Sequence, residues 1–248
     1  MSRPITILTF LIVGMSSPAL AKDAADPGWG GTIELNGSNT TGNNNTTNVG
    51  IRLKLKNRGA DWRHNLATSA DYGKARGRTN KERFRVDYKI GRDIGERSYL
   101  FANANYFSDD FGAFKNGAFL GSGYGYQVLE TEPIMWKLEA GIGYRSQKAR
   151  LKQKAPDDPI NRKDSFTSAR LFSDFEYDFS EAVALANDTE IFYSDVDTYL
   201  INETSVTSDL FGALAMRASF RVETHTDVPV GREKTDTVSR LGIVYTME

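Results

Sequence analysis

The sequence predicts an all-β protein: a transmembrane antiparallel up-and-down β-barrel of about 12 strands, preceded by a cleavable signal peptide. Three observations predict this fold class. Apolar and polar residues alternate through most of the chain, aromatic residues recur at the two ends of the alternating stretches, and an export signal precedes them. A period of two is that of a β-strand, whose successive side chains point to opposite faces.

The composition excludes several classes of protein. The 248 residues include 31 Lys and Arg against 32 Asp and Glu, a formal net charge of -1. The basic excess of a nucleic-acid-binding protein is missing, so no nucleic acid partner is expected. A mean hydropathy of -0.46 argues against a helical membrane protein. The chain has no cysteine and only 2 histidines, which excludes disulfides and argues against a metal site. We expect no cofactor.

Residues 1–21 have the pattern of a signal peptide. Arg3 supplies a positive charge, Ile5–Met15 is an apolar run, and Pro18–Ala21 ends in the small residues that signal peptidase requires. The alternative, an uncleaved anchor helix, conflicts with the shortness of the apolar run. We therefore expect cleavage after Ala21 and a barrel formed by residues 22–248.

Six strands are expected in the first half of the barrel. The first two alternate Ile, Leu and Val with polar or basic residues, and the third begins with Trp and ends with Tyr. In the fourth, apolar residues occupy the even-numbered positions and charged residues the odd-numbered ones. The fifth has less distinct faces, and glycines fill most of one face of the sixth. These strands cover about residues 29–38, 49–56, 62–72, 83–90, 100–106 and 117–128.

Six more strands follow. The seventh again begins with Trp, the eighth places acidic residues opposite aromatic ones, the ninth and tenth alternate weakly, and the last two alternate clearly. They cover about residues 136–145, 169–179, 183–193, 199–207, 214–223 and 240–247. The longest irregular segment is expected at 146–165. Connections after odd-numbered strands, such as 39–46, 73–80 and 225–234, are longer than those after even-numbered strands, the asymmetry typical of outer-membrane barrels.

Aromatic and charged residues favour a membrane barrel over a secreted or periplasmic soluble sheet. Charges deep within strands, such as Arg85, Asp174 and Arg221, need a polar lumen in which they can pair. Tryptophans begin odd-numbered strands and tyrosines lie near the other end, so two belts are expected at the membrane interfaces, in contact with outer-membrane lipids. The belt residues are Trp29, Trp62, Trp136, Tyr72, Tyr106 and Tyr144.

The final strand has an order of residue types that resembles the C-terminal signal of bacterial outer-membrane barrels. A polar residue, Arg240, is followed by Gly242, the aromatic Tyr245 and the hydrophobic Met247. The resemblance implies that this strand closes the sheet on the first strand. It also implies that the barrel assembly machinery and periplasmic chaperones are partners, and that the location is the outer membrane of a Gram-negative bacterium.

Several short motifs resemble those of the YdiY-type salt-induced outer-membrane proteins, a family of unknown function. They are Gly28–Gly31, Thr41–Asn43, Trp62–His64, Thr226–Pro229, Lys234–Thr237 with Gly231, and Val244–Tyr245. The likeness covers almost the whole mature chain. It implies a barrel in the outer membrane and supplies no catalytic residues. One departure is the end of the chain, Met247–Glu248, where such proteins often carry Phe.

Few residues are candidates for chemistry. His225 lies in an expected external loop near Asp227, with Ser219 on the preceding strand, and outer-membrane lipid hydrolases use Ser and His near the barrel rim. The simpler interpretation of His225 is a solvated loop histidine. His64 is interpreted as an interfacial residue beside Trp62. The pair Asp157–Asp158 lacks the loop spacing of a calcium site.

Charged residues are expected to line the lumen. A basic wall faces an acidic strand in one of two ways: the walls pair and plug the lumen, which we favour, or they leave a narrow channel for small or anionic solutes. The residues are Arg52, Lys54, Arg83 and Arg85 on one side and Asp174, Glu176 and Asp178 on the other. We therefore expect a non-enzymatic barrel with a structural or envelope-stress role; the alternatives are a channel and a lipid-modifying enzyme.

Overall fold

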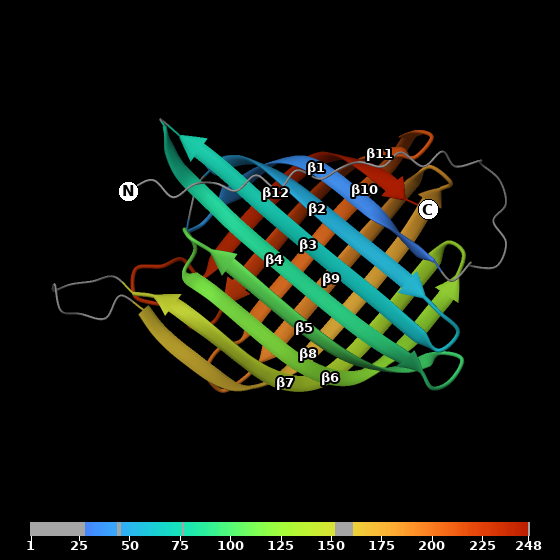
Figure 1. The fold of residues 1–248 in the computed structure, drawn as a ribbon, viewed down its shortest axis with the longest axis horizontal. Helices are drawn as coiled ribbons and strands as arrows, with labels where there is room; N and C mark the ends of the chain where they lie inside the picture. Colours follow the sequence, from blue (N-terminus) through green and yellow to red (C-terminus); the bar gives the residue numbers. More distant parts are fainter. Residues whose placement is uncertain (1–27, 44–45, 76, 152–160, 248) are drawn as a thin grey trace.

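The structure is a computed structural model that describes residues 28–43, 46–75, 77–151 and 161–247. These residues form one closed antiparallel barrel of twelve strands (Figure 1), which confirms the predicted fold class. The predicted signal peptide and the pair Asp157–Asp158 lie outside the described residues. The strands are β1 (Trp29–Thr41), β2 (Thr46–Arg58), β3 (Trp62–Ala75), β4 (Arg78–Asp93), β5 (Ser98–Asp109), β6 (Phe114–Thr131), β7 (Ile134–Arg150), β8 (Asn161–Ser180), β9 (Val183–Tyr193), β10 (Tyr199–Phe211), β11 (Leu214–His225) and β12 (Thr235–Met247).

The last strand closes the barrel, as its sequence predicts. β12 pairs with β1 from Gly31 opposite Met247 to Thr41 opposite Thr237, and with β11 on its other side. In Figure 1 the red β12 lies beside the blue β1. The sheet therefore has no free edge, as a sheet surrounded by hydrocarbon requires. No helix among the described residues is long and apolar enough to cross a membrane.

The barrel is apolar outside and polar inside. On β1, Leu35 is 63% exposed on the outer wall, whereas the neighbouring Glu34 is 2% exposed and faces the lumen. Ile142 and Arg145 show the same contrast on β7. A soluble barrel would bury its apolar face, so this distribution is that of an outer-membrane barrel whose outer wall contacts hydrocarbon.

The two ends of the barrel differ. Connections after even-numbered strands are short turns, such as 59–61, 132–133 and 212–213, and they define the turn end, which in outer-membrane barrels faces the periplasm. Connections after odd-numbered strands include 194–198 and 226–234, and they define the loop end. The predicted asymmetry between the two ends is therefore present, although not at every hairpin.

Three expected loops are shorter than predicted, because the strands on each side are longer. The loop expected at 73–80 is reduced to 76–77, and that at 39–46 to 42–45. Both ends of the segment 146–165, expected to be irregular, are strand, with Gln147 opposite Asp164. This hairpin has 17 and 20 residues in its strands, more than the ~10 that cross a membrane. Beyond the hydrocarbon both faces are polar, so the alternation that identifies a strand disappears there.

The glycines of β6 make room for aromatic rings in the lumen. Gly123 and Gly125 face inward beside Phe101 and Tyr99 of β5. A Cβ atom at Gly125 would lie 2.2 Å from the Tyr99 ring, and one at Gly123 would lie 2.7 Å from the Phe101 ring. The glycine face of the sixth predicted strand thus allows large side chains to fill this side of the lumen.

We predict that Gly125→Val impairs barrel formation, because the Tyr99 ring occupies the space that the new side chain needs. Overpacking of this kind costs about 1–3 kcal/mol. The measurement is the folded fraction in membranes, read from heat-modifiable gel mobility, together with the urea midpoint in detergent. Ser122→Val on the outer wall of the same strand is the control and should fold normally. Equal folding of both variants would contradict this packing.

Candidate functional site

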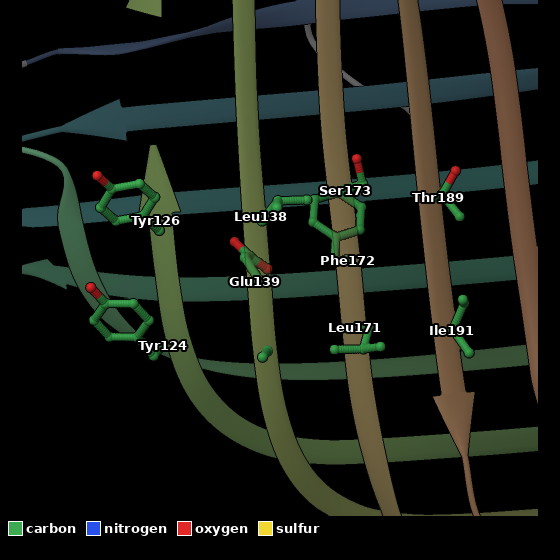
Figure 2. Close-up of a pocket in the computed structure, with 10 residues that line it drawn as sticks. Tyr124, Tyr126, Leu138, Glu139, Leu171, Phe172, Ser173, Thr189 and Ile191 are labelled. Atoms are coloured by element: carbon green, nitrogen blue, oxygen red, sulfur yellow. The ribbon is translucent and has the colours of Figure 1, made fainter. Parts of the chain in front are cut away.

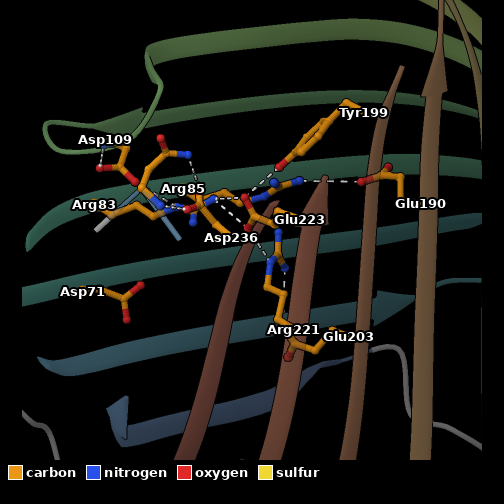
Figure 3. Close-up of polar contacts among 12 residues, drawn as sticks. Asp71, Arg83, Arg85, Asp109, Glu190, Tyr199, Glu203, Arg221, Glu223 and Asp236 are labelled. Carbon is orange, nitrogen blue, oxygen red and sulfur yellow. Dashed lines mark hydrogen bonds and ion pairs between the residues drawn. The ribbon is translucent and has the colours of Figure 1, made fainter. Parts of the chain in front are cut away.

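A carboxylate in the lumen joins opposite walls of the barrel. Glu223 of β11 accepts hydrogen bonds from Arg83 of β4 at 2.8 Å, from Arg221 at 2.6 Å and from the Tyr199 hydroxyl at 3.0 Å. Figure 3 shows these side chains converging from different strands. Because β4 and β11 are separated by several strands in either direction around the barrel, the Arg83–Glu223 pair crosses the lumen.

A second carboxylate extends this network. Glu203 of β10 receives a two-pronged pair from Arg52 of β2, at 2.6 and 3.0 Å, and a hydrogen bond from Arg221 at 3.4 Å. Arg221 therefore links the Glu203 and Glu223 carboxylates. Arg240 of β12 reaches Asp71 of β3 at 3.3 Å nearby. We call the central group the lumen partition; it consists of Arg52, Arg83, Tyr199, Glu203, Arg221 and Glu223.

A separate group of ion pairs lines the adjoining wall. Arg170 of β8 binds Glu139 at 2.8 Å and Glu190 at 2.6 Å. Glu139 also pairs with Lys89 and accepts a hydrogen bond from the Tyr99 hydroxyl at 2.7 Å. Charges that face a lumen inside a bilayer are only partly hydrated, so such multiple pairing offsets the cost of burying them.

An aromatic cluster fills the lumen towards the loop end. Phe119, Phe192, Tyr199 and Ile201 are buried against one another. The guanidinium carbon of Arg145 lies 4.6 Å from the centre of the Tyr199 ring, and Arg145 forms no ion pair with any described residue. The stacking of a cation on an aromatic face substitutes for a carboxylate partner. The alternation did not predict this cluster, because it places apolar residues on the lipid-facing side of a strand.

The structure corrects the interpretation of His225. It is the last residue of β11, and its side chain faces the lumen with 12% of its surface exposed; its ring stacks on Tyr199 with 4.1 Å between centres. Its Nδ1 atom is 2.6 Å from Asp197, whereas Asp227 pairs with Arg162 at 3.2 Å. Ser219 lies on the same strand about 20 Å away at ~3.4 Å per residue. Ser219, His225 and Asp227 therefore do not come together as a catalytic triad requires.

Asp197 fastens the connection 226–234 to the barrel. Its carboxylate accepts hydrogen bonds from the backbone N–H groups of Thr226 at 3.1 Å and Asp227 at 3.2 Å, besides the contact with His225. Burial acts to raise the pKa of Asp197, but the hydrogen bond and charge of His225 outweigh it, so the pKa lies below its ordinary value.

The predicted lumen charges all take inward positions, but their pairing differs from expectation. Arg52, Arg83 and Arg85 pair with acids of β9, β10 and β11, and with Asp87, instead of with the acids of β8. Asp174 pairs with Lys137 on the next strand at 3.6 Å. The reason is their position along the barrel axis. β8 carries Asp174, Glu176 and Asp178 near the turn end, whereas Arg83 and Arg85 lie nearer the loop end of β4.

The lumen is not filled at every level. A cavity of about 300 Å³ lies next to the partition and extends towards the turn end. Lys54 lines it together with Asp174, Glu176 and Asp188, so charges of both signs face the space. Within the described residues, no cluster of His, Asp and Glu has the arrangement of a metal site.

The predicted belt residues lie on the outer wall or beside it, whereas the closing-strand residues divide between its two faces. Trp29 and Trp62 are exposed near the turn end, and Trp136 donates a hydrogen bond to Ser173 at 3.0 Å. Tyr72, Tyr106 and Tyr144 are exposed in the half nearer the loop end. His64, as predicted, faces outward and contacts Tyr88 at 2.8 Å. On β12, Tyr245 and Met247 face outward, and Arg240 and Gly242 face the lumen.

Comparisons with known proteins give a family and a fold. The family model "Protein of unknown function, DUF481" matches residues 33–247. The NanC porin is similar in structure, with a TM-score of 0.52 and 12% identity over 86% of this chain and 98% of that chain. The translocator domain of the autotransporter NalP from Neisseria meningitidis has a TM-score of 0.53 and 13% identity over 90% of each chain. At these identities the likeness is one of fold. The curated protein sequences contain no match.

We predict that Asp197→Ala exposes the connection 226–234 to protease. The loss of the hydrogen bonds from the Thr226 and Asp227 backbone to the Asp197 carboxylate costs about 1–3 kcal/mol locally. The measurement is the rate of trypsin cleavage after Arg232 and Lys234 in intact outer membranes. The control is Asp195→Ala, at an exposed position of the connection 194–198 that also carries Asp197, and it should not change the rate.

The contact between Asp197 and the connection 226–234 should also depend on pH. Because the folded pKa of Asp197 lies below the ordinary value of 3.8, its stabilisation is complete above that value and is lost as pH falls through the folded pKa. Cleavage by an acid-active protease should therefore rise below about pH 4 in the parent and change less in Asp197→Ala. Equal pH dependence in both proteins would count against the contact.

Proposed function

The chain belongs to the family described as "Protein of unknown function, DUF481", and we propose that it is a non-catalytic outer-membrane barrel with a structural role in the cell envelope. The observation that carries the proposal is the lumen partition. Its ion pairs join opposite walls and obstruct the path through the barrel. Ion pairs that cross the lumen occupy space that a solute would need, which favours a closed barrel over an open pore.

The energetics of the partition support a closed lumen. A solute that crosses the barrel has to separate Arg52 from Glu203, or Arg83 from Glu223. Breaking a buried ion pair costs about 3–5 kcal/mol when one partner is left without a counter-charge. Because Arg221 contacts both carboxylates, the pairs are coupled and the barrier exceeds that of one isolated contact.

The absence of a catalytic constellation around His225 supports a non-enzymatic role. Its described neighbours are Asp197, Tyr199 and Phe114, and none of them is an ordinary nucleophile for lipid hydrolysis. We further propose that the protein is of the YdiY-type, salt-induced kind, a proposal supported by the motifs Thr226–Pro229 and Lys234–Thr237. The amount of protein in cells grown at low and high salt is the measurement that checks this type.

A narrow channel is the second candidate function. The cavity of about 300 Å³ beside the partition favours it, because charges of both signs line a space large enough for small hydrated solutes. On this hypothesis the partition is a gate. Recording in planar bilayers separates the two functions, because a channel shows unitary currents in the parent protein.

We predict that the parent protein shows no stable unitary conductance in planar bilayers, and that the double variant Arg83→Ala/Glu223→Ala does. Removing both partners opens the space they occupy without changing the net charge of the lumen, and Arg221 retains its contact with Glu203. Arg162→Ala/Asp227→Ala removes a pair of the same chemistry at the exposed rim and is the control, expected to behave like the parent. Steady currents of equal size in all three proteins would contradict the partition and favour the channel.

We also propose that β12 is recognised by the barrel assembly machinery, since Tyr245 and Met247 point outward beside β1. We predict that Tyr245→Asp lowers the amount of assembled barrel several-fold, because it places a carboxylate against lipid, and charged side chains on the lipid face destabilise membrane barrels. Val230→Asp is the control, because Val230 is 84% exposed in a connection at the loop end. Equal assembly of both variants would oppose the proposal.

A further inference from the structure

The outer wall carries a compact block of uncharged polar side chains. Asn187 and Thr189 of β9 lie opposite Thr204 and Asn202 of β10 in the strand register. The four side chains point outward, because the alternate residues Phe192 and Glu203 face the lumen. We call this group the outer polar block.

Most of the side chains around the outer polar block are apolar; the exception is Ser173 of β8, which lies opposite Thr189. Towards the loop end the next outward residues are Ile191 and Leu200, and towards the turn end they are Leu185 and Val206. Phe220 of β11 lies opposite Thr204, and Phe175 of β8 lies opposite Asn187. The block therefore interrupts the apolar surface of the membrane-spanning band and does not belong to the polar rim at the loop end.

The hydrogen bonds within the block leave part of its capacity unused. Asn187 donates to Thr204 at 2.8 Å, Thr189 donates to Asn187 at 3.1 Å, and Asn202 donates to Thr189 at 2.7 Å. The Asn202 carboxamide oxygen and the Thr204 hydroxyl proton form no hydrogen bond with any described residue. Hydrocarbon supplies no partner for them, so exposure to lipid alone is unfavourable.

We propose that the outer polar block is the contact surface for a second copy of this chain, which forms a dimer in the membrane. A carboxamide is both donor and acceptor, so identical asparagines related by a two-fold axis satisfy one another. An acyl chain lacks such groups. A charged lipid headgroup would be matched by basic residues, and the block carries no charge. The complementary surface that the structure itself supplies is the same block on another copy.

The two regions of the outer wall that flank the block are complementary in shape to one another. An apolar groove of about 400 Å³ runs across β6–β9, and Figure 2 shows Leu171, Ile191 and Thr189 among its lining residues. On the other side of the block, Phe220 and Met216 of β11 project from the outer wall. A two-fold axis along the membrane normal places β11 of one copy against the β7–β8 side of the other, so a projecting side faces a hollowed side.

Cysteine cross-linking tests the proposal directly, because the chain contains no cysteine. Single cysteines at Asn187, Thr189, Asn202 and Thr204 are oxidised in native outer membranes. We expect a disulfide-linked species of twice the monomer mass from at least one of these positions. Thr68→Cys on the outer wall of β3 is the matched control and should remain monomeric. No dimer at any of the four positions, or equal cross-linking of Thr68→Cys, overturns the proposal.

A second measurement separates loss of contact from loss of folding. The mass of the unmodified protein in mild detergent should be that of a dimer. The double variant Asn187→Leu/Asn202→Leu should weaken dimerisation about ten-fold or more while retaining heat-modifiable mobility. Ser122→Leu elsewhere on the outer wall should leave it unchanged. A monomeric parent, or cross-linking to a different protein instead of a second copy, overturns the assignment.

Discussion

The rest of the structure depends on one constraint: a sheet in hydrocarbon must satisfy all of its backbone hydrogen bonds internally. The pairing of β1 with β12 meets that constraint. Once the sheet is closed, every strand has one face towards lipid and one towards the lumen, and side chains have to sort accordingly. Leu35 and Glu34 are neighbours in sequence with opposite surroundings for this reason. The lumen then takes the charged residues, and its electrostatics become the central property of the molecule.

Pairing across the lumen resolves those electrostatics. Glu223 receives three donors from β4, β10 and β11, and Arg221 joins it to Glu203. Both carboxylates thus receive donors from other strands, and strands distant in sequence are joined without backbone contact. The same demand for partners applies to polar groups on the outer wall, where Asn187 and Asn202 have no lumen to face. In both the lumen and the outer polar block, polar groups with little access to water need hydrogen-bond partners from protein.

The period-two alternation was enough to predict the strands, their number and the inward direction of residues such as Arg52 and Asp174, and the resemblance of the last strand to an outer-membrane signal implied closure. The alternation contained no information on the position of a residue along the barrel axis. Each strand tilts, so the axial position of Asp174 relative to Arg83 depends on the stagger of the whole barrel, and the predicted pairing was wrong. His225 was assigned to a loop because turn-forming residues follow it directly, although its odd-numbered register with Arg221 and Glu223 points inward. The strand ends beyond the membrane were missed because both of their faces are polar.

The cross-lumen pairs have a mechanical consequence. A thin cylindrical wall resists stretching better than it resists flattening, because flattening changes curvature and leaves the wall's perimeter the same. Arg52–Glu203 and Arg83–Glu223 act as struts between walls that share no backbone hydrogen bonds. Flattening in any direction that separates these walls has to lengthen a strut. The barrel therefore keeps its cross-section when the lateral pressure of the surrounding bilayer changes, a property that an unbraced cylinder of the same strands lacks.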